Sequence, residues 1–366
     1  EMTSSLVGSE MCIRDSLGTV RRIALQGRQT MNSRQLMASL ARKTLVFIAM
    51  MFLLSLIVFY VSRLTPGDPL QSFYGDAMQS MTTTELDAAR ERLGLNGPIW
   101  MQYAKWIGNV MQGDFGISLK YKRPVLDVVS PLIGNTLMLG GIAYALVFML
   151  AIALALFCAR FEDTFMDRFV CRIGTVAFYV PAFWMGVVLV LVFSVNLKLL
   201  PSSGAYGIGK SGDMADRLRH LVLPLIVMVA SHLWYYAYMI RNKLLDEIRR
   251  DYVLLARAKG LGRTRVLLSH CLRNVLPTIV SIMAISIPHV LSGTYVAESV
   301  FNYPGIGLLA VSSAKYHDYN LLMLMVLITG AMVMLSSLVA QAVNEVIDPR
   351  MKSSDAVSYT HLTLPT

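Results

Sequence analysis

Charged residues are scarce in this chain. Asp, Glu, Lys and Arg make up only 15% of its 366 residues, whereas hydrophobic residues make up 55% and the mean hydropathy is +0.54. A soluble globular domain typically carries about 25% charged residues, so this composition argues against a water-soluble fold. The few charges also gather in blocks, which leaves long uncharged stretches between them.

Cysteine is also rare, and its placement argues against two further classes of protein. The four cysteines are Cys12, Cys158, Cys171 and Cys271. None lies in a segment that the charge pattern places outside the cell, and no pair has the spacing of a zinc site. We therefore predict neither a disulfide framework nor a metal site, and we expect these side chains to be packing residues.

Sets of catalytic side chains are missing as well. No Ser, His and Asp triad and no pair of carboxylates shares one face of a predicted helix, and the uncharged stretches contain no series of acids. We therefore do not predict an enzyme, and we expect no cofactor in this chain. A carrier that works without an ATPase, or an intramembrane enzyme, would need such groups inside the membrane, so we keep either only as a distant alternative for the function of this chain.

Six stretches without charge are long enough to cross a bilayer, which takes roughly 20 residues of helix. They are Thr44 to Ser62, Val128 to Ala159, Ile173 to Leu197, His220 to Ile240, Asn274 to Ala297 and Tyr319 to Asn344. Each must be helical, because lipid offers no partner to a free backbone N–H or C=O. The sequence therefore predicts an all-α polytopic membrane protein with about six transmembrane helices.

The positions of the cations predict the orientation of these helices. Arg34, Arg42 and Lys43 precede the first stretch, and nine more cations lie between the fourth and fifth: Arg241, Lys243, Arg249, Arg250, Arg257, Lys259, Arg263, Arg265 and Arg273. Loops rich in Lys and Arg stay in the cytoplasm, so we expect both termini inside. The net charge of +10 then reflects topology and lipid contact rather than nucleic-acid binding.

Hydropathy and topology divide the chain into four parts. We expect 1–30 and 353–366 to be non-native or disordered flanks, because they share neither the hydropathy nor the topology of the rest. Between them we predict an N-terminal span with an extracytoplasmic cap over 31–130. The core transmembrane domain is predicted over 131–352, with a cytoplasmic loop at 246–277.

The predicted cap contains two helical patterns. Thr82 to Leu95 opens with a capping residue at Thr84 and closes at Gly94. Pro98 to Gln112 places Ile99, Tyr103, Trp106 and Val110 along one face. Aromatic rings at that spacing suit a helix in the membrane interface, a surface helix tucked against the protein, or a contact with substrate.

The cytoplasmic segment from Arg241 to Pro277 has more than a topology signal. Apolar residues recur at helical spacing through Leu254, then Gly260-Leu261-Gly262 forms a turn, and a second amphipathic stretch runs from Val266 to Leu272. Two short helices joined by a glycine turn can protrude from a membrane and fit a groove of a partner protein.

At this segment the chain resembles the ABC-importer permeases for oligopeptides, dipeptides and nickel. The coupling loop of that family resembles Asp251-Tyr252-Val253, then Ala256-Arg257-Ala258-Lys259-Gly260-Leu261 and Leu276-Pro277, although the glutamate of the broader EAA pattern is absent here. Further similar motifs are Leu64 to Pro69, Leu93-Gly94-Leu95, Gln102-Tyr103, Gly113 to Ser118, Asn135-Thr136-Leu137, Pro181-Phe183-Gly186, Leu200 to Gly204, Glu298 to Phe301, Tyr303 to Gly307 and Asp348-Pro349-Arg350. The resemblance covers approximately Met31 to Lys352.

The resemblance implies the permease subunit of a type I importer in the bacterial plasma (inner) membrane. Its expected partners are a second permease, which is a different chain, two cytoplasmic ABC ATPases and an extracytoplasmic solute-binding protein. The expected solutes are di- or oligopeptides, with nickel or a metal chelate as the alternative. The residues expected to couple the pathway to the ATPase are Asp251, Tyr252, Ala256, Arg257, Ala258, Lys259, Gly260 and Leu261.

Polar residues of the fifth stretch are candidates for the solute pathway. They are Ser286, His289, Ser292 and Thr294, and Glu298 at the outer end is a candidate gate. Polar groups at this depth commonly face a cavity, but hydrogen bonds between helices explain them equally well, and Glu298 could instead be an interfacial anchor.

A match to the nucleotide-binding pattern GxxxxGKS occurs at Gly204 to Ser211. A phosphate-binding loop needs a buried strand before it and a helix after it, whereas a predicted membrane span precedes this one. The predicted topology also places it outside the cell, so we do not predict nucleotide binding.

Overall fold

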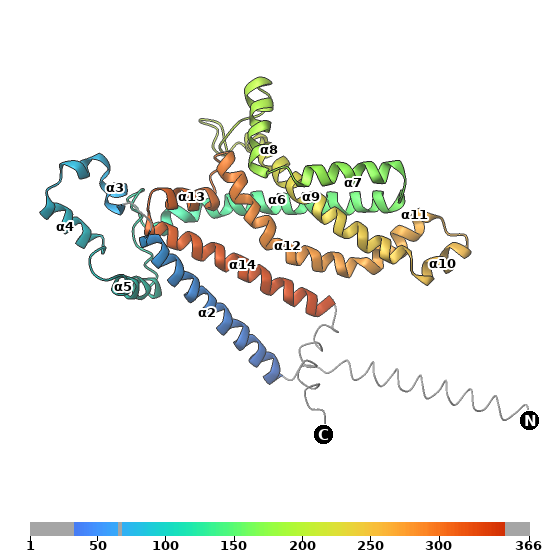
Figure 1. The fold of residues 1–366 in the computed structure, drawn as a ribbon, viewed down its shortest axis with the longest axis horizontal. Helices are drawn as coiled ribbons and strands as arrows, with labels where there is room; N and C mark the ends of the chain where they lie inside the picture. The colour runs from blue at the N-terminus through green and yellow to red at the C-terminus, as the bar shows by residue number, and fades with distance from the viewer. Residues whose placement is uncertain (1–32, 65–67, 348–366) are drawn as a thin grey trace, which may run out of the picture. The chain divides into compact units, whose positions relative to one another are not determined.

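The computed structural model describes residues 33–64 and 68–347, and Figure 1 shows their fold. Within these ranges all regular elements are helices, apart from one isolated bridge between Ile117 and Pro124. The α-helices are α2 (Ser33–Leu64), α3 (Pro69–Tyr74), α4 (Thr83–Arg92), α5 (Ile99–Met111), α6 (Val125–Arg160), α7 (Phe165–Phe178), α8 (Ala182–Leu189), α9 (Met214–Ile248), α10 (Asp251–Ala258), α11 (Arg263–Val266), α12 (Leu272–Val300), α13 (Ile306–Lys315) and α14 (Tyr319–Ile347). One segment is a 3₁₀-helix, η1 (Gly75–Ser80), and two are π-helices, η2 (Val190–Asn196) and η3 (Leu267–Cys271).

The chain divides into two units, Glu1–Leu53 and Leu54–Thr366. The described part of the first unit is the beginning of α2. All contacts given below lie within the second unit. The predicted flanks 1–30 and 353–366 and the motif Asp348-Pro349-Arg350 lie outside the described residues, as do Thr65, Pro66 and Gly67.

Five helices in the described part of the chain are long and apolar enough to cross a membrane. They are Ala41–Leu64, Val125–Arg160, Met214–Ile248, Arg263–Val300 and Tyr319–Val343. Each contains most of one predicted stretch, so the all-α, polytopic fold class is confirmed. A sixth crossing exists when α7 is counted together with the segment from Ala182 to Asn196.

That sixth crossing is not the straight helix predicted over Ile173 to Leu197. Here α7 ends at Phe178, the chain resumes as α8, and the two axes differ by 95°. Pro181 is the N-cap of α8. Because proline has no N–H and pushes the preceding residue out of helical geometry, it ends α7 and lets the chain turn before α8 begins. The prediction of one continuous span was wrong at this point.

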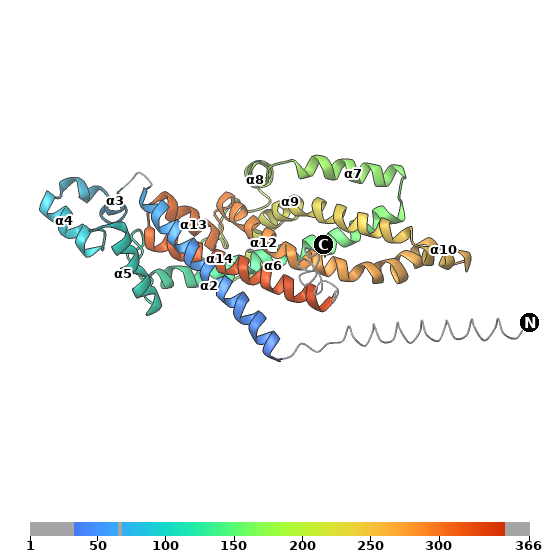
Figure 2. The same cartoon turned by 60° about the horizontal axis from the view of Figure 1, so that its bottom comes forward.

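The core of the second unit is built on α6 and α9, which lie side by side in Figures 1 and 2. The face of α6 toward the core carries small side chains, and Ala143, Ala151 and Ala155 are each at most 1% exposed. Small residues at helical spacing let two helices approach closely within a membrane. Phe148 fills the space beside them and packs on Tyr236 of α9, with ring centroids 4.8 Å apart.

The cap is formed by α3, η1, α4 and α5. The N-cap of α4 is Thr82, two residues before the predicted Thr84, and it forms a capping box with Glu85. The hydrogen bond from the backbone N–H of Thr82 lowers the pKa of the Glu85 carboxyl. As predicted, α4 is closed by Gly94, whose φ is +67°. In α5 the aromatic face is tucked against the protein, since Tyr103 and Trp106 pack on Phe59 and Met323.

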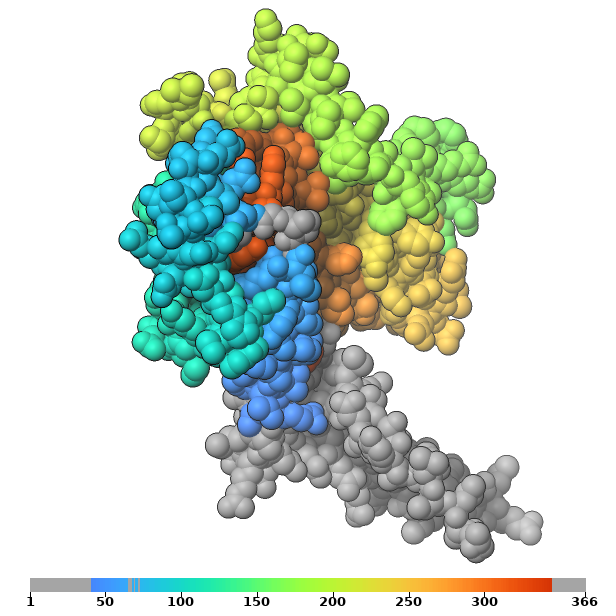
Figure 3. Space-filling model, turned by 60° about the vertical axis from the view of Figure 1, so that its left-hand side comes forward, coloured from blue at the N-terminus to red at the C-terminus, as the bar shows by residue number. Residues whose placement is uncertain are grey.

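The segment after α5 is fastened to the chain before α14. The carboxylate of Asp318, which is fully buried, accepts hydrogen bonds from Ser118 Oγ at 2.5 Å and from the backbone N–H of Lys120 at 3.1 Å. Lys120 Nζ donates to Ser312 Oγ of α13 at 2.9 Å. Figure 3 shows the light-blue to cyan surface of the cap beside the orange surface of the chain around α13.

Candidate coupling loop and membrane pathway

The turn after α10 has the geometry that the glycine predicted. The N–H of Gly260 donates to the carbonyl of Arg257 at 2.9 Å, and the N–H of Leu261 donates to the carbonyl of Ala256 at 3.2 Å. Together these two bonds form a Schellman motif, which needs a residue in the left-handed region. Gly260 supplies it with φ of +81°. The loop is therefore a defined structure rather than a loose connection.

The two faces of α10 differ in what they contact. Val253 is fully buried and Ala256 is 8% exposed, because both pack on the main hydrophobic core. On the opposite side Leu254 is 61% and Leu255 58% exposed, and Arg257 beside them is exposed as well. In Figure 1, α10 projects beyond the ends of α6, α9 and α12. An exposed apolar pair with a neighbouring cation suits docking into a groove of a partner.

Two residues at the start of α10 hold it in place. The hydroxyl of Tyr252 donates to Glu247 Oε1 at 2.8 Å, and Asn274 Nδ2 donates to the same oxygen at 3.2 Å. Burial, together with the hydrogen bond to Glu247, raises the pKa of Tyr252, which therefore stays a neutral donor. Asp251 lies exposed in the first turn of α10, where its negative charge interacts favourably with the positive end of the helix dipole. The helix is thus anchored to the end of α9 and the start of α12.

The turn between α6 and α7 braces the coupling loop from the other side. Glu162 accepts from Arg249 Nη2 at 2.9 Å and lies 3.5 Å from Arg263 Nη2. Arg263 also donates to the carbonyl of Ala159 at 3.2 Å, and Arg160 Nε donates to Thr264 Oγ1 at 2.8 Å. These contacts, which we call the brace at Glu162, hold the chain on both sides of α10: at Arg249 before it, and at Arg263 and Thr264 after it. Sequence reasoning missed it, although the acid lies in a predicted cytoplasmic turn and could have been paired with the excess of cations.

A buried ion pair joins α7 to α9 near the same end of the molecule. Arg241 Nε donates to Asp167 Oδ1 at 2.8 Å, and Arg241 Nη2 donates to Asp167 Oδ2 at 2.5 Å. The side chains are only 15% and 3% exposed respectively. Such a two-bond pairing fixes geometry as well as charge. The prediction contained no hint of it, because the two residues are 74 positions apart.

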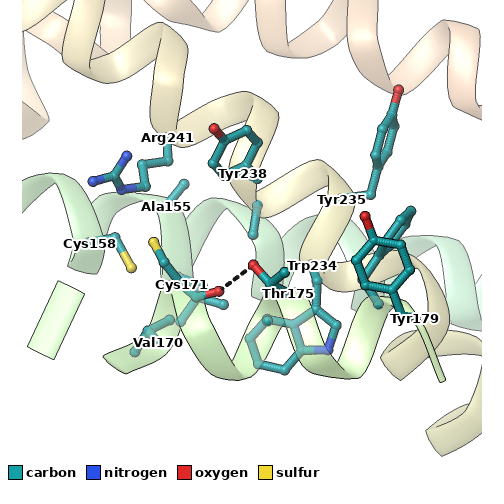
Figure 4. Close-up of a pocket in the computed structure, with 14 residues that line it drawn as sticks. Ala155, Cys158, Val170, Cys171, Thr175, Tyr179, Trp234, Tyr235, Tyr238 and Arg241 are labelled. Carbon is teal, nitrogen blue, oxygen red and sulfur yellow. Dashed lines mark hydrogen bonds between the residues drawn. The ribbon is translucent and has the colours of Figure 1, made fainter. Parts of the chain in front are cut away.

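A cavity of about 350 Å³ opens beside this pair, between α6, α7 and α9. Figure 4 shows Arg241 and two cysteines at one end and aromatic rings at the other. The lining rings include Phe178, Tyr179, Trp234, Tyr235 and Tyr238. The cavity is therefore mostly apolar, and its one cation is already paired with an acid.

Two cysteines and an acid come together at the polar end of this cavity. The ligand atoms of Cys158, Asp167 and Cys171 lie within 4.8 Å of one another. The sequence spacing did not predict this grouping. Because Arg241 occupies both oxygens of Asp167, a cation bound there would have to displace a guanidinium group. The donor set therefore does not fit a metal ion well, and the expectation of no metal in this chain stays a prediction.

The four pathway candidates on α12 do not share one face. Ser286 and Thr294 are buried, and their hydroxyls donate to carbonyls of their own helix, at Met283 and Leu291. His289 and Ser292 are exposed, one helical turn apart. Ser292 Oγ also donates to a carbonyl of its own helix, at Pro288. The two pairs therefore differ in exposure, and only the second pair is open to a partner or a solute. Their role in a pathway stays a prediction.

Glu298 has a definite structural task at the start of α13. It is fully buried, and its carboxylate accepts from the N–H groups of Gly307 and Leu308 at 2.7 and 3.1 Å and from Thr136 Oγ1 at 2.6 Å. A carboxylate on the free N–H groups of a helix N-terminus stabilises that helix. A Cβ at Gly305 would lie 2.2 Å from this carboxyl carbon, so glycine is required there. A gating role for Glu298 stays a prediction.

The loop that matches the nucleotide-binding pattern is closed by an acid. Asp216 Oδ2 accepts from the N–H of Gly207 at 2.6 Å, and its other oxygen lies 3.5 Å from Lys210 Nζ. The elements on either side of the loop are η2 and α9, so no strand precedes it. The groups that would hold a phosphate are engaged by a carboxylate.

Comparisons with known proteins agree with this architecture. The family model described as "Binding-protein-dependent transport system inner membrane component" matches residues 151–353, and the model of the N-terminal part of such components matches residues 36–140. The oligopeptide transport system permease protein AppB of Bacillus subtilis (strain 168) is 32% identical over 86% of this chain and 99% of its own length. The glutathione transport system permease protein GsiC of Escherichia coli (strain K12) is 31% identical over 85% of this chain and 97% of its own length.

A solved chain of the MetNI methionine ABC transporter aligns with 60% of this chain and 97% of its own length, at 15% identity and a TM-score of 0.46. The sequence relatives, not this alignment, decide the family. Nearly their full length is matched, and the apolar helices agree with a multi-pass protein of the inner membrane. The chain belongs to the family of binding-protein-dependent transport system inner-membrane components, and it is a transport subunit rather than an enzyme.

Proposed function

We propose that this chain forms half of the solute pathway of an ATP-driven importer for peptides. Relatives that match nearly end to end are named for oligopeptides and for glutathione, which is itself a peptide. These names support peptides over the nickel or metal-chelate alternative. The donor set at Cys158, Asp167 and Cys171, with its carboxylate engaged by Arg241, gives metal transport no added support.

The observation that carries the proposal is the exposed face of α10. A pathway can respond to ATP hydrolysis in another subunit only through a surface that touches that subunit. Leu254 and Leu255 are exposed on a helix whose other face is anchored in the core. We therefore infer that this helix docks on a cytoplasmic ABC ATPase, and that the cavity-forming helices behind it respond through the brace at Glu162.

The remaining partners and the orientation follow from the same proposal. The basic segment around α10 faces the cytoplasm, both termini lie inside, and the cap faces an extracytoplasmic solute-binding protein. A second permease, a different chain, completes the pathway. A reporter enzyme fused at Gly260 tests the orientation: reagents that cannot cross the membrane should reach it only from the cytoplasmic side, and access from outside would refute it.

The coupling itself can be tested with a matched pair of substitutions at Gly260. No atom lies within 4 Å of a Cβ built there, and Asn and Asp both tolerate the left-handed region. Gly260→Asp adds a negative charge at the docking end of α10, whereas Gly260→Asn has the same shape without the charge. In the reconstituted importer we expect the Asp variant to lose peptide uptake and solute-stimulated ATP hydrolysis, while the Asn variant keeps most of both.

Membrane insertion of the two variants should be equal, which separates a coupling defect from misfolding. Normal uptake by the Asp variant would show that this end of α10 does not dock on the ATPase. Uptake by the purified chain alone in liposomes, without any ATPase, would instead favour a carrier.

A further inference from the structure

The cap helix α5 has one exposed flank that nothing in the described part of the protein covers. Its core face packs on the protein through Tyr103 and Trp106. Next to that face, Trp100 is 61% exposed and Met111 is 84% exposed. These two residues lie on one flank with Ala104 and Ile107, at steps of four, three and four residues. All four are apolar.

The opposite flank of α5 is polar. Gln102, Lys105 and Asn109 recur at steps of three and four, and Lys105 and Asn109 are exposed. Met101, at the boundary between the flanks, is 51% exposed. The helix therefore has three surfaces: a face that packs on the protein, an apolar flank and a polar flank. A soluble cap gains nothing from leaving an indole and a thioether in water, so the apolar flank needs an occupant.

The contacts of α5 show which flank points into the membrane. Gln102 Oε1, on the polar flank, accepts from Arg63 Nε at 3.1 Å, and Arg63 is in the last turn of α2. On the face that packs on the protein, the hydroxyl of Tyr103 is hydrogen-bonded to Ser55 Oγ at 2.8 Å. The Arg63 guanidinium lies over the ring of Phe59, and Ser55 precedes Phe59 by four residues of the same helix, which is about 6 Å along the axis. The polar flank thus faces the outer end of the span.

The apolar flank lies correspondingly deeper. Ile107 packs in a cluster that includes Leu56 of α2 and Leu327 of α14. Leu56 is eight residues from the end of α2, and Leu327 is eight residues from the start of α14, so each lies about 12 Å inside its span. Figures 2 and 3 show α5 beside the end of α2 that leads into the cap.

The stretch of α2 on which α5 packs also carries exposed apolar side chains. On the same stretch of α2, Ile57 is 51% and Val61 57% exposed. Tryptophan and other amphipathic or apolar side chains are enriched where acyl chains meet head groups. A helix with an apolar flank at that depth and a lysine on its other flank has the pattern of an interfacial helix.

We propose that α5 lies in the outer leaflet of the bilayer as an interfacial anchor of the cap. Trp100, Ala104 and Met111 contact phospholipid at the boundary between head groups and acyl chains. Lys105 faces the phosphate layer and the water beyond it. The cap is then held at a fixed height at the membrane surface by lipid as well as by the protein. This inference rests on the membrane location of the family and not on the proposed solute or on ATP coupling.

Spin labels on the two flanks test the proposal directly. The full chain, with its native cysteines replaced by serine, is given one cysteine at a time by Ala104→Cys, Met111→Cys, Lys105→Cys or Asn109→Cys. Each variant is labelled with a nitroxide in vesicles of phosphatidylethanolamine and phosphatidylglycerol. Collision rates are measured with oxygen, which concentrates in lipid, and with a water-soluble nickel chelate.

We expect the ratio of oxygen to nickel collisions to be severalfold higher at positions 104 and 111 than at positions 105 and 109. Equal ratios at all four positions would overturn the proposal. So would shielding of 104 and 111 from both reagents, which would mean that protein covers the flank.

A second measurement keeps the native cysteines. Phospholipids brominated on the acyl chain quench tryptophans that touch them, and the wild-type chain is compared with Trp100→Phe. We expect the quenched share of the emission to fall in the variant. An unchanged quenched share would show that Trp100 is not in contact with lipid, and it would overturn the proposal.

Discussion

The buried pair of Arg241 and Asp167 gives a prediction whose size follows from its exposure. Asp167 is 3% exposed and receives two hydrogen bonds, of 2.8 and 2.5 Å, from the guanidinium group. Asp167→Asn keeps the shape of the side chain but leaves a buried cation without a counter-charge. Removing one partner from a buried pair costs about 3–5 kcal/mol. The folded-to-unfolded ratio should therefore fall by about two to three and a half powers of ten.

The same reasoning predicts that removing both partners is far less harmful. In the double variant Asp167→Leu with Arg241→Met, no unpaired charge remains, and apolar side chains fill the space. Replacing a buried ion pair in this way is often neutral or stabilising. The double variant should therefore be more stable than Asp167→Asn, even though it changes more atoms.

Equilibrium unfolding of the purified chain in mixed micelles, with an increasing fraction of denaturing detergent and circular dichroism as the signal, measures these differences. Arg249→Gln is the control, because Arg249 is 67% exposed in its pair with Glu162 and should lose under about 1 kcal/mol. An Asn variant within about 1 kcal/mol of wild type would refute the buried-charge argument, given the penalty expected for such a pair. A double variant no more stable than Asp167→Asn would refute it equally.

Three further predictions concern the loop, the outer end and the packing of α7. Glu162→Gln removes the charge that faces two arginines around α10 and should lower the number of peptides imported per ATP, with protein insertion unchanged; a normal ratio would show that the brace has no part in coupling. Gly305→Ala would place a Cβ 2.2 Å from the carboxyl carbon of Glu298, so increased hydrogen exchange in the first turn of α13 is expected, and unchanged exchange would contradict the capping role. Gly174→Ala would place a Cβ 2.7 Å from Trp234 and should shift the wavelength of the tryptophan emission. An unchanged emission spectrum would contradict this close contact.

Much of the fold could be predicted because a membrane imposes simple rules. An uncharged stretch of sufficient length must be a helix, and five such stretches proved continuous. The bend before α8 was missed although Pro181 lies inside the predicted span. Hydropathy does not register it, because proline breaks a helix through its missing N–H and its ring, not through polarity.

The coupling loop was predictable for a local reason. Its Schellman turn depends on residues close in sequence, and the glycine that permits it is visible in the pattern. The brace at Glu162 and the pair of Asp167 with Arg241 depend on residues far apart in sequence. Nothing in a single sequence states which cation an acid will meet.

For the cap, too, the sequence could not show which distant residues would meet. The periodicity of α5 correctly placed Tyr103 and Trp106 on one face, but it did not say whether protein or lipid covers that face. For Glu298 the sequence showed an acid at the end of a span, and only the fold brought the start of α13 onto it.

The carboxylate of Asp318 touches two parts of the molecule at once. It accepts from Ser118 and Lys120 on the cap side, and also from the N–H of Leu321 in the first turn of α14 at 3.3 Å. One short side chain therefore serves as the joint between an outer lobe and a transmembrane rod. A displacement of the outer lobe at Ser118 therefore reaches the first turn of α14 through a single carboxylate.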